Sequence, residues 1–422
     1  MTAVAIWGTF DVDNYGDHLF AAVARAELGR RLPGVTVDAW SPLGWLHRTR
    51  LDAPAGRAAR PLGPRTEARL DLFAAAYDAV LVGGGELIHG NDRMLAQVYR
   101  APAEAVVTVE PARWFVEGLG AGREERCPLV WNAVGVTALE GALASSVGRA
   151  LAGRRYVAVR DPGSRRRLEA AGVTGPVAVV PDTAVLVDRL YPPTALDTEV
   201  RALRQGGLLP DGPVLLLQGC DLVAGRAVEV ARAVEAVLAR HPALSPVILE
   251  TGPCRGDRLF AEALAAALGA AATRLPASLT LRQTVAVIRD SAAFVGTSLH
   301  GAVTCLGFDR PFLVLDLAGE PKLAGLAAVV DRPEWVVDEP GAVPDRLADA
   351  LAATGRRELR SRLQGRIDAH FDEVAGIVGP GRGAPCPDAR LELERSAVVH
   401  HTGVLRELAE RSARAAGLAR ER

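Results

Sequence analysis

A strand, a turn of small residues, a helix and a second strand follow one another between residues 292 and 316, and this order constrains the fold more than any other feature. The apolar run 292–295 predicts a buried strand, 302–308 a short helix, and 312–316 a second strand. Asp309-Arg310-Pro311 ends the helix, because proline cannot continue it. The two strands of such a unit lie parallel in one sheet, with the turn at their carboxyl ends. The sequence therefore predicts a parallel α/β sheet with a crevice at this turn.

The same alternation of strands and helices recurs along the chain in two series. A chain of 422 residues is too long for one hydrophobic core. We predict an N-terminal α/β domain at 1–190, a C-terminal α/β domain at 191–345 and a helical C-terminal extension at 346–422. The hinge between the first two is Tyr191-Pro192-Pro193-Thr194. The fold class is α/β: two Rossmann-like, doubly wound domains facing a cleft, which is the glycosyltransferase-B-like architecture.

Apolar runs and helical periodicity set the other expected elements. The expected strands are 4–8, 35–40, 78–82, 128–136, 156–161, 177–184, 213–219 and 246–250. The expected helices are 19–30, 164–172, 197–206, 227–240, 280–289 and 391–416. A polar, Arg- and Pro-rich passage at about 49–69 predicts an exposed loop. Residues 91–114 predict an irregular segment that serves as a lid or an acceptor-binding loop.

Charge and hydropathy indicate neither a nucleic-acid nor a membrane-surface partner. The formal net charge is −1, and no run approaches the ~20 apolar residues that span a bilayer. The N-terminus passes directly into a strand without a basic leader, so we expect a cytoplasmic protein with no transmembrane segment.

The turn before the helix at 302–308 is the first candidate site. Thr297 and Ser298 precede His300 there, and small residues leave backbone N–H groups free to meet an anion at the helix start. An imidazole at the carboxyl ends of parallel strands is well placed for chemistry. The alternative is that His300 only caps or packs the helix.

Two glycine-containing loops follow other strands of the first series. The loop after the first strand contains Asn14, Gly16 and Asp17, and Asp17 stands where a helix N-cap is expected. Gly84 and Gly85 lie at the carboxyl end of the strand at 78–82, where glycines let a ligand approach the backbone. A helix cap and a plain tight turn are the structural alternatives for these loops.

Lys322 is the only lysine, among 49 lysines and arginines. Arginine replaces lysine wherever the exchange is harmless in such a composition, whereas a site that needs a compact point charge resists it. Chance survival is the alternative. Asp11-Val12-Asp13 is the one Asp-x-Asp in a candidate site loop, but two loop aspartates usually form turns, so we expect no metal.

The ordered set of these motifs resembles the polysaccharide pyruvyl transferase family over residues 1 to about 330. The matching pieces are Asn14-Tyr15-Gly16-Asp17 (N-x-G-D), Asp78 to Gly85, Val159-Arg160-Asp161 with Ser164 and Gly172, Val180-Pro181-Asp182, and Ser298-Leu299-His300-Gly301 followed by Gly307 and Pro311.

This resemblance implies a transferase of polysaccharide biosynthesis that moves a pyruvyl group from phosphoenolpyruvate to a saccharide as a cyclic ketal and releases phosphate. Phosphoenolpyruvate is then a co-substrate, and no cofactor is implied. By resemblance His300 is the general acid, Lys322 and Arg160 hold phosphate or carboxylate, and Asp17 orients or deprotonates an acceptor hydroxyl. The further substrate-binding residues predicted from the motifs are Asn14, Gly16, Gly84, Gly85, Asp182, Thr297 and Ser298. The acceptor is a saccharide, a glycan or a lipid-linked saccharide.

Ser298 departs from the family pattern, which often has arginine two residues before the histidine. Either another cation substitutes, with Thr297, Ser298 and the helix start donating hydrogen bonds, or the donor has changed. A glycosyltransferase with a nucleotide-sugar donor, for which Arg255 is an available cation, remains an alternative. A non-catalytic binding protein is a further one. The last helix predicts packing or a homodimer contact.

Overall fold

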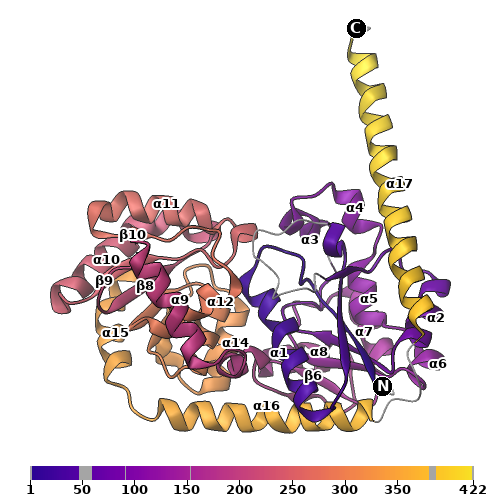
Figure 1. Ribbon diagram of the computed structural model, residues 1–422, viewed down its shortest axis with the longest axis horizontal. Coiled ribbons are helices and arrows are strands. Elements are labelled where there is room, and N and C mark those ends of the chain that lie inside the picture. Colours follow the sequence, from indigo (N-terminus) through magenta and orange to yellow (C-terminus); the bar gives the residue numbers. More distant parts are fainter. Residues whose placement is uncertain (1, 47–58, 91, 153, 380–385, 421–422) are drawn as a thin grey trace.

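The computed structural model describes residues 2–46, 59–90, 92–152, 154–379 and 386–420. It has two α/β halves side by side, joined underneath by one long helix, while a second long helix projects from one end (Figure 1). All strand pairs within each half are parallel. The predicted fold class is therefore confirmed.

The first sheet has seven strands within the described residues, in the order β3-β2-β1-β4-β5-β6-β7. They are β1 (Ala3–Trp7), β2 (Thr36–Ser41), β3 (Arg60–Pro61), β4 (Ala79–Gly83), β5 (Leu129–Val134), β6 (Val157–Val159) and β7 (Ala178–Val179). The helices of this half are α1 (Tyr15–Arg31), α2 (Glu67–Ala76), α3 (Asp92–Tyr99), α4 (Ala103–Val107), α5 (Pro111–Glu117), α6 (Ala121–Glu124), α7 (Gly141–Leu151) and α8 (Pro162–Ala170).

The second sheet has six strands in the described chain, in the order β10-β9-β8-β11-β12-β13. They are β8 (Val214–Gln218), β9 (Ser245–Ile248), β10 (Thr273–Arg274), β11 (Ala293–Gly296), β12 (Phe312–Leu315) and β13 (Val336–Val337). Its helices are α9 (Pro193–Gln205), α10 (Ala227–Arg240), α11 (Asp257–Leu268), α12 (Leu281–Asp290), α13 (Leu299–Gly307), α14 (Pro321–Val330) and α15 (Val343–Ala352). Short 3₁₀ helices include η1 (Gly44–Leu46), η2 (Thr183–Arg189), η3 (Asp221–Arg226) and η4 (Pro253–Arg255).

Strand alternation divides the apolar residues between the faces of each sheet. In β1, Val4 and Ile6 join a cluster with Leu19 of α1, whereas Ala5 and Trp7 join a cluster on the other face. The first of these clusters continues into the second half. There it includes Leu216 of β8, Phe294 of β11 and Val303 of α13. One apolar core therefore joins the two sheets and fixes how their edges meet.

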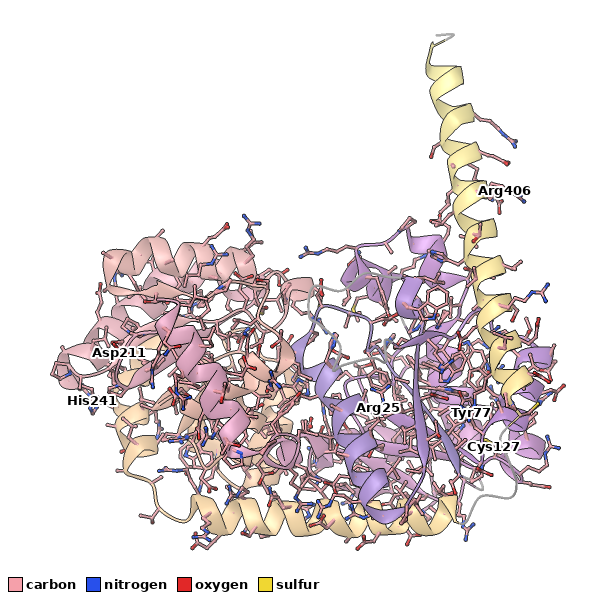
Figure 2. All side chains as sticks on the ribbon, in the orientation of Figure 1. Arg25, Tyr77, Cys127, Asp211, His241 and Arg406 are labelled. Atoms are coloured by element: carbon pink, nitrogen blue, oxygen red, sulfur yellow. The ribbon has the colours of Figure 1, made fainter. Side chains whose placement is uncertain are left out.

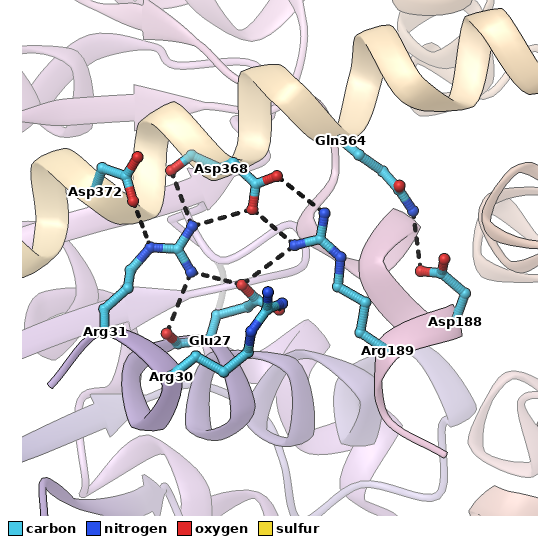
Figure 3. A network of polar contacts seen from close by, with 8 residues as sticks. All are labelled: Glu27, Arg30, Arg31, Asp188, Arg189, Gln364, Asp368 and Asp372. Atoms are coloured by element: carbon cyan, nitrogen blue, oxygen red, sulfur yellow. Dashed lines mark hydrogen bonds and ion pairs between the residues drawn. The ribbon is translucent and has the colours of Figure 1, made fainter. Parts of the chain in front are cut away.

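The last two helices return to the first half. Helix α16 (Arg356–Val378) runs beneath both halves and packs against α1. Asp368 of α16 accepts from Arg31 of α1 at 3.0 Å and from Arg189 of η2 at 2.7 Å, and Arg31 also reaches the buried Glu27 (Figure 3). Helix α17 (Pro387–Arg420) packs against α2 and β3.

Beyond that contact α17 extends away from the body, and Arg406 lies on the projecting part (Figure 2). The predicted helical extension thus turns back onto the N-terminal half, while the division at residue 190 stays a prediction.

Several expectations on local structure are wrong. Residues 91–114 were expected to be irregular, but α3, α4 and part of α5 lie there, because Pro102 and Pro111 stand at helix N-termini, where proline is tolerated. The expected loop at 49–69 falls partly outside the described residues. Its described part contains β3 and the start of α2.

The expected strand at 177–184 is shorter, and η2 begins within it. Helix α1 starts four residues before the expected 19, because Asn14 rather than Asp17 is its N-cap.

Candidate active site

His300 lies in the first turn of α13, where the edges of the two halves meet. Ser298 is the N-cap of this helix, and its Oγ accepts from the Gly301 N–H at 3.1 Å. The imidazole is 13% exposed and packs edge-on against Phe20 of α1, with ring centroids 5.0 Å apart. A Cβ on Gly16 would lie 1.9 Å from Nδ1 of His300, so the glycine lets α1 cover that nitrogen.

Asp182 stands opposite the other imidazole nitrogen. Its Oδ2 lies 3.6 Å from Nε2 of His300, and its Oδ1 accepts from the Ala184 N–H at 3.0 Å. Neither Nε2 nor Oδ2 has a hydrogen-bond partner among the described residues. Burial raises the pKa of Asp182, but His300 and Arg160 outweigh it and hold the pKa below its ordinary value. Asp182 is thus a carboxylate that favours a proton on Nε2.

The β1–α1 loop closes over His300 from the N-terminal half. The Asn14 side chain accepts from the Gly16 N–H at 3.1 Å, so it serves as a helix cap. Asp17 accepts from the Thr9 hydroxyl at 2.5 Å. Burial raises the pKa of Asp17, although His300 nearby opposes this shift.

The glycines after β4 have a packing role. Gly84 and Gly85 have φ of +76° and +78°, a region that side chains disfavour. A Cβ on Gly84 would also lie 1.8 Å from Cγ of Phe20, the ring that supports His300. Gly85 lies near Asp17, whose Oδ1 would be 3.6 Å from such a Cβ. These positions therefore need glycine whether or not a substrate contacts them.

Two cations from opposite halves line one cavity beside Asp182. Arg160 follows β6, and its guanidinium lies against Gly135, where a Cβ would be 2.8 Å from Cζ. Lys322 stands in the first turn of α14 and pairs with Glu320. The cavity has a volume of ≈ 20 Å³, room for about one water. It is lined by Arg160, Asp161, Asp182, Leu299, Lys322, Leu326 and Val329.

Glu86 is a site residue that the sequence analysis missed. Its Oε1 lies 3.3 Å from Nη2 of Arg160, and its side chain is 29% exposed. Burial raises the pKa of Glu86, but Arg160 and three other cations outweigh it and lower the pKa. The available signal was an acidic residue directly after a strand and three glycines, at the sheet edge where sites form.

Thr297 does not line the cavity, and its side chain contacts the end of β8 in its own half. Its Oγ1 donates to Oε1 of Gln218 at 3.3 Å, and Gln218 donates in turn to Asp257 at 2.8 Å. The loop that Asp257 holds is joined to the β1–α1 loop by backbone hydrogen bonds from Tyr15 to Thr251 and from Cys254 to Asp13. The predicted residues of both halves are thus brought together at one edge, with Thr297 at its border.

Within the described residues no group of three or more His, Cys, Asp or Glu side chains is arranged to hold a metal ion. No helix in the described part of the chain is both long enough and apolar enough to span a membrane.

The sequence comparison identifies one family. The model of the family Polysaccharide pyruvyl transferase matches residues 14–318. This range includes the turn with His300 and both glycine loops but ends before Lys322. No curated protein matches the chain.

Solved structures with a similar fold include a sugar-nucleotide epimerase and a glycosyltransferase. UDP-GlcNAc 2-epimerase from Neisseria meningitidis, bound to UDP-GlcNAc, aligns with a TM-score of 0.50 and 12% identity, over 89% of this chain and 99% of that one. A glycosyltransferase from Rickettsia africae aligns with a TM-score of 0.52 and 10% identity, over 90% and 99%. At this identity the likeness establishes the two-domain, glycosyltransferase-B-like fold alone.

Proposed function

This chain belongs to the polysaccharide pyruvyl transferase family, and on that premise we propose that it transfers a pyruvyl group from phosphoenolpyruvate to a saccharide as a cyclic ketal. Membership makes it a transferase of polysaccharide modification. One observation supports the donor: Arg160 and Lys322 line one cavity beside the His300–Asp182 pair. Two cations at such a place suit a ligand that carries a carboxylate and a phosphate.

In this proposal the donor replaces the glutamates that now pair with the two cations. Arg160 is paired with Glu86 and Lys322 with Glu320. A space of ≈ 20 Å³ is too small for phosphoenolpyruvate, so α14, which carries Lys322, Leu326 and Val329, moves away from Arg160 before the donor enters. Lys322 then supplies the second cation in place of the arginine that Ser298 replaces.

The reaction needs a proton donor for the methylene carbon and two hydroxyls for the adjacent carbon of the donor. His300 gives the proton on Nε2 to the methylene carbon of the donor, and Asp182 holds the imidazole for that step. One acceptor hydroxyl attacks the adjacent carbon, phosphate leaves with its bridging oxygen, and a second hydroxyl of the same sugar completes the ketal. Of the two hydroxyl protons, one restores the proton that His300 gave up and the other leaves with the phosphate. Asp17 is half-buried and bonded to Thr9. In this scheme it fixes the position of α1 and contributes to the electric field at His300.

A nucleotide-sugar glycosyltransferase is the second candidate, and Arg255 favours it. This side chain is exposed at the β9–α11 loop and has no hydrogen bond or ion pair with the residues that the structure describes. A free guanidinium beside the cleft suits a diphosphate. Binding of UDP in preference to phosphoenolpyruvate would favour this reading.

Calorimetric titration of phosphoenolpyruvate into the wild type and three variants tests the donor. We expect binding by the wild type and a Kd raised at least roughly tenfold in Arg160→Ala and in Lys322→Ala, because each loses a charge-assisted contact. Arg332→Ala, which removes an exposed arginine paired with Glu334, is the control and should bind normally. No binding at millimolar donor, or preferred binding of UDP, would overturn the proposal.

Activity is measured as phosphate release from phosphoenolpyruvate in the presence of methyl glycosides of glucose, galactose and mannose. We expect His300→Ala to lose at least about 100-fold in rate while it remains folded, because general acid catalysis contributes that much. Unchanged activity in His300→Ala would show that His300 is not the acid. If the wild type neither released phosphate nor bound phosphoenolpyruvate, a non-catalytic binding protein would be the remaining hypothesis.

We also propose that the enzyme works in the cytoplasm and that the projecting part of α17 contacts a second copy. Leu405 on this part is 41% exposed. Light scattering on the whole chain and on a chain ending at Gly403 would test the homodimer, since only the longer chain is expected to give twice the mass of one copy.

A further inference from the structure

Three carboxylates near His300 and Arg160 already have structural partners. Asp161 accepts from the backbone N–H and the hydroxyl of Ser164, at 2.7 and 2.9 Å, as the N-cap of α8. Asp17 accepts from Thr9, and Asp182 accepts from the Ala184 N–H and faces Nε2 of His300. A substrate hydroxyl on Asp161, or on the bonded oxygens of Asp17 and Asp182, would compete with contacts that hold the fold. The remaining Oδ2 of Asp182 faces Nε2 of His300 at 3.6 Å, so a hydroxyl bound there would separate the proposed acid from its carboxylate.

Glu86 differs from all three. Within the described residues its carboxylate contacts Arg160 and accepts no hydrogen bond from a backbone group. It follows β4 directly after Gly83, Gly84 and Gly85, at the same sheet edge as Arg160, and it is partly open to solvent. Glu86 is therefore a charged acceptor group beside the proposed donor cation with unused hydrogen-bonding capacity.

We propose that the carboxylate of Glu86 binds the paired hydroxyls of the saccharide acceptor and takes the proton of the hydroxyl that attacks first. This inference rests on the proposed pyruvyl transfer and names the acceptor side of the same site. The acceptor class is a sugar with two free hydroxyls close enough to close one ketal ring.

The chemistry of the ketal motivates this assignment. Ring closure uses two hydroxyls of one sugar on the same donor carbon, so the site has to hold them as a pair. A carboxylate has two oxygens that can each accept one hydroxyl. As the first hydroxyl oxygen bonds to the donor carbon, its proton passes to a Glu86 oxygen, while the proton gained by the methylene carbon comes from His300.

The charges around Glu86 fit a base that starts ionised. Burial raises the pKa of Glu86, but Arg160, Lys322 and further cations lower it more, so the group is a carboxylate at neutral pH. Arg160 contacts Glu86 and lines the donor cavity, so a donor that takes this guanidinium leaves the Glu86 carboxylate beside it and open to the acceptor. Holding two reactants side by side lowers the barrier, because their translational and rotational entropy is lost before the reaction.

The test compares Glu86→Gln with Glu117→Gln. Gln keeps the shape and one acceptor oxygen but cannot take a proton. Glu117, the last residue of α5, is the control: it is 31% exposed, pairs with Arg65 at 3.1 Å and with Arg113 at 3.0 Å, and lies outside the described site. Phosphoenolpyruvate binding is followed by calorimetry, and contact of methyl glucoside, galactoside and mannoside with the donor-loaded protein by saturation-transfer NMR.

We expect Glu86→Gln to bind phosphoenolpyruvate at least as tightly as the wild type, since a competitor for Arg160 is gone, and to lose the saccharide signal and about 100-fold or more in phosphate release. Glu117→Gln should match the wild type in all three. Saccharide contact that survives in Glu86→Gln, or that is absent from a wild type binding the donor, overturns the inference and leaves the donor proposal intact. A wild type that binds no phosphoenolpyruvate overturns the proposed function instead.

Discussion

The starts of α1 and α13 are built alike and differ in what they contribute. Each follows a strand in the interior of its sheet, β1 or β11, and each begins with a polar N-cap. Asn14 caps the Gly16 N–H, and Ser298 caps the Gly301 N–H, both at 3.1 Å. The first start presents a glycine and the half-buried carboxylate of Asp17, and the second presents an imidazole.

This difference shows that residues of both halves form the surroundings of His300, the proposed acid. His300 belongs to α13, but Gly16 of the N-terminal half covers its Nδ1, and Asp182 of the same half faces its Nε2. The second half alone positions the imidazole without choosing which nitrogen carries the proton. Changes in the first half should therefore alter the chemistry of His300 without touching it.

The largest expected effect comes from Gly16→Ala. A Cβ there would lie 1.9 Å from Nδ1 of His300, and the ring cannot yield, because Phe20 and Asp182 stand on its other sides. We expect phosphate release to fall by about 100-fold or more, since a displacement of about 1 Å has that cost. Gly29→Ala in the same helix has nothing within 4 Å and should raise the free energy of unfolding by roughly 0.5–1 kcal/mol. If Gly16→Ala kept full activity, the two starts would not be coupled.

Asp182→Asn should reduce the rate by a smaller factor, roughly 10- to 100-fold, because the general acid stays in place but loses the carboxylate that supports its proton. The Kd for phosphoenolpyruvate should change less than about threefold, since Arg160 and Lys322 supply the donor contacts. Calorimetry and the phosphate assay together separate these effects. A large rise in Kd with the rate at saturation unchanged would instead mean that Asp182 touches the donor.

The sequence predicts the local part of this arrangement well. Helix α10 begins and ends at the expected 227 and 240, and β11 and β12 lie where their apolar runs place them. Helix α13 begins at Leu299, three residues before the expected 302, because Ser298 is its N-cap, so His300 lies in the helix and not in the turn before it. These elements depend on periodicity and on breakers such as Pro311, which act over a few residues. The family motifs likewise identify His300 and Arg160 as candidates, although their chemical roles stay predictions.

The pairings between distant residues were beyond sequence reasoning. No local pattern sets Asp182 opposite His300, because the two come from different sheets whose approach depends on the shared apolar core. Glu86 was missed for a related reason: it belongs to the site through its contact with Arg160, which follows another strand. Helices α3 to α5 were missed because their prolines resemble loop residues until their N-terminal positions are known.

The stability that the β1–α1 loop contributes should depend on pH, which distinguishes this loop from the turn before α13. Asp11 braces this loop, accepting from Tyr99 at 2.5 Å and from the Gly44 N–H at 2.6 Å, and burial raises its pKa to about 7. Between its unfolded value of 3.8 and 7 the folded protein holds more protons on this group than the unfolded chain. Stability from Asp11 is therefore greatest at low pH and is lost as pH rises toward 7.

We expect this group to make the protein about 2 kcal/mol more stable at about pH 5.5 than at about pH 7. Urea unfolding of the wild type and of Asp11→Asn at both pH values measures it, because the variant removes this contribution and leaves the others. Equal pH dependence in the two proteins would mean that Asp11 is ionised in the fold and that its hydrogen bonds outweigh burial.

The smallest expected effects test the likeness of the two starts. Asn14→Ala and Ser298→Ala each remove one cap acceptor, and each should lower the free energy of unfolding by about 1 kcal/mol. Their consequences for the donor should differ, because Asn14 only caps its helix, whereas the Ser298 hydroxyl still has a proton to donate at the turn beside His300. A weaker Kd for phosphoenolpyruvate in Ser298→Ala alone would show that this serine has taken over part of the clamp that arginine supplies elsewhere in the family. An equal Kd for phosphoenolpyruvate in both variants would mean that Ser298 only caps its helix and that Lys322 is the cation that replaces the arginine.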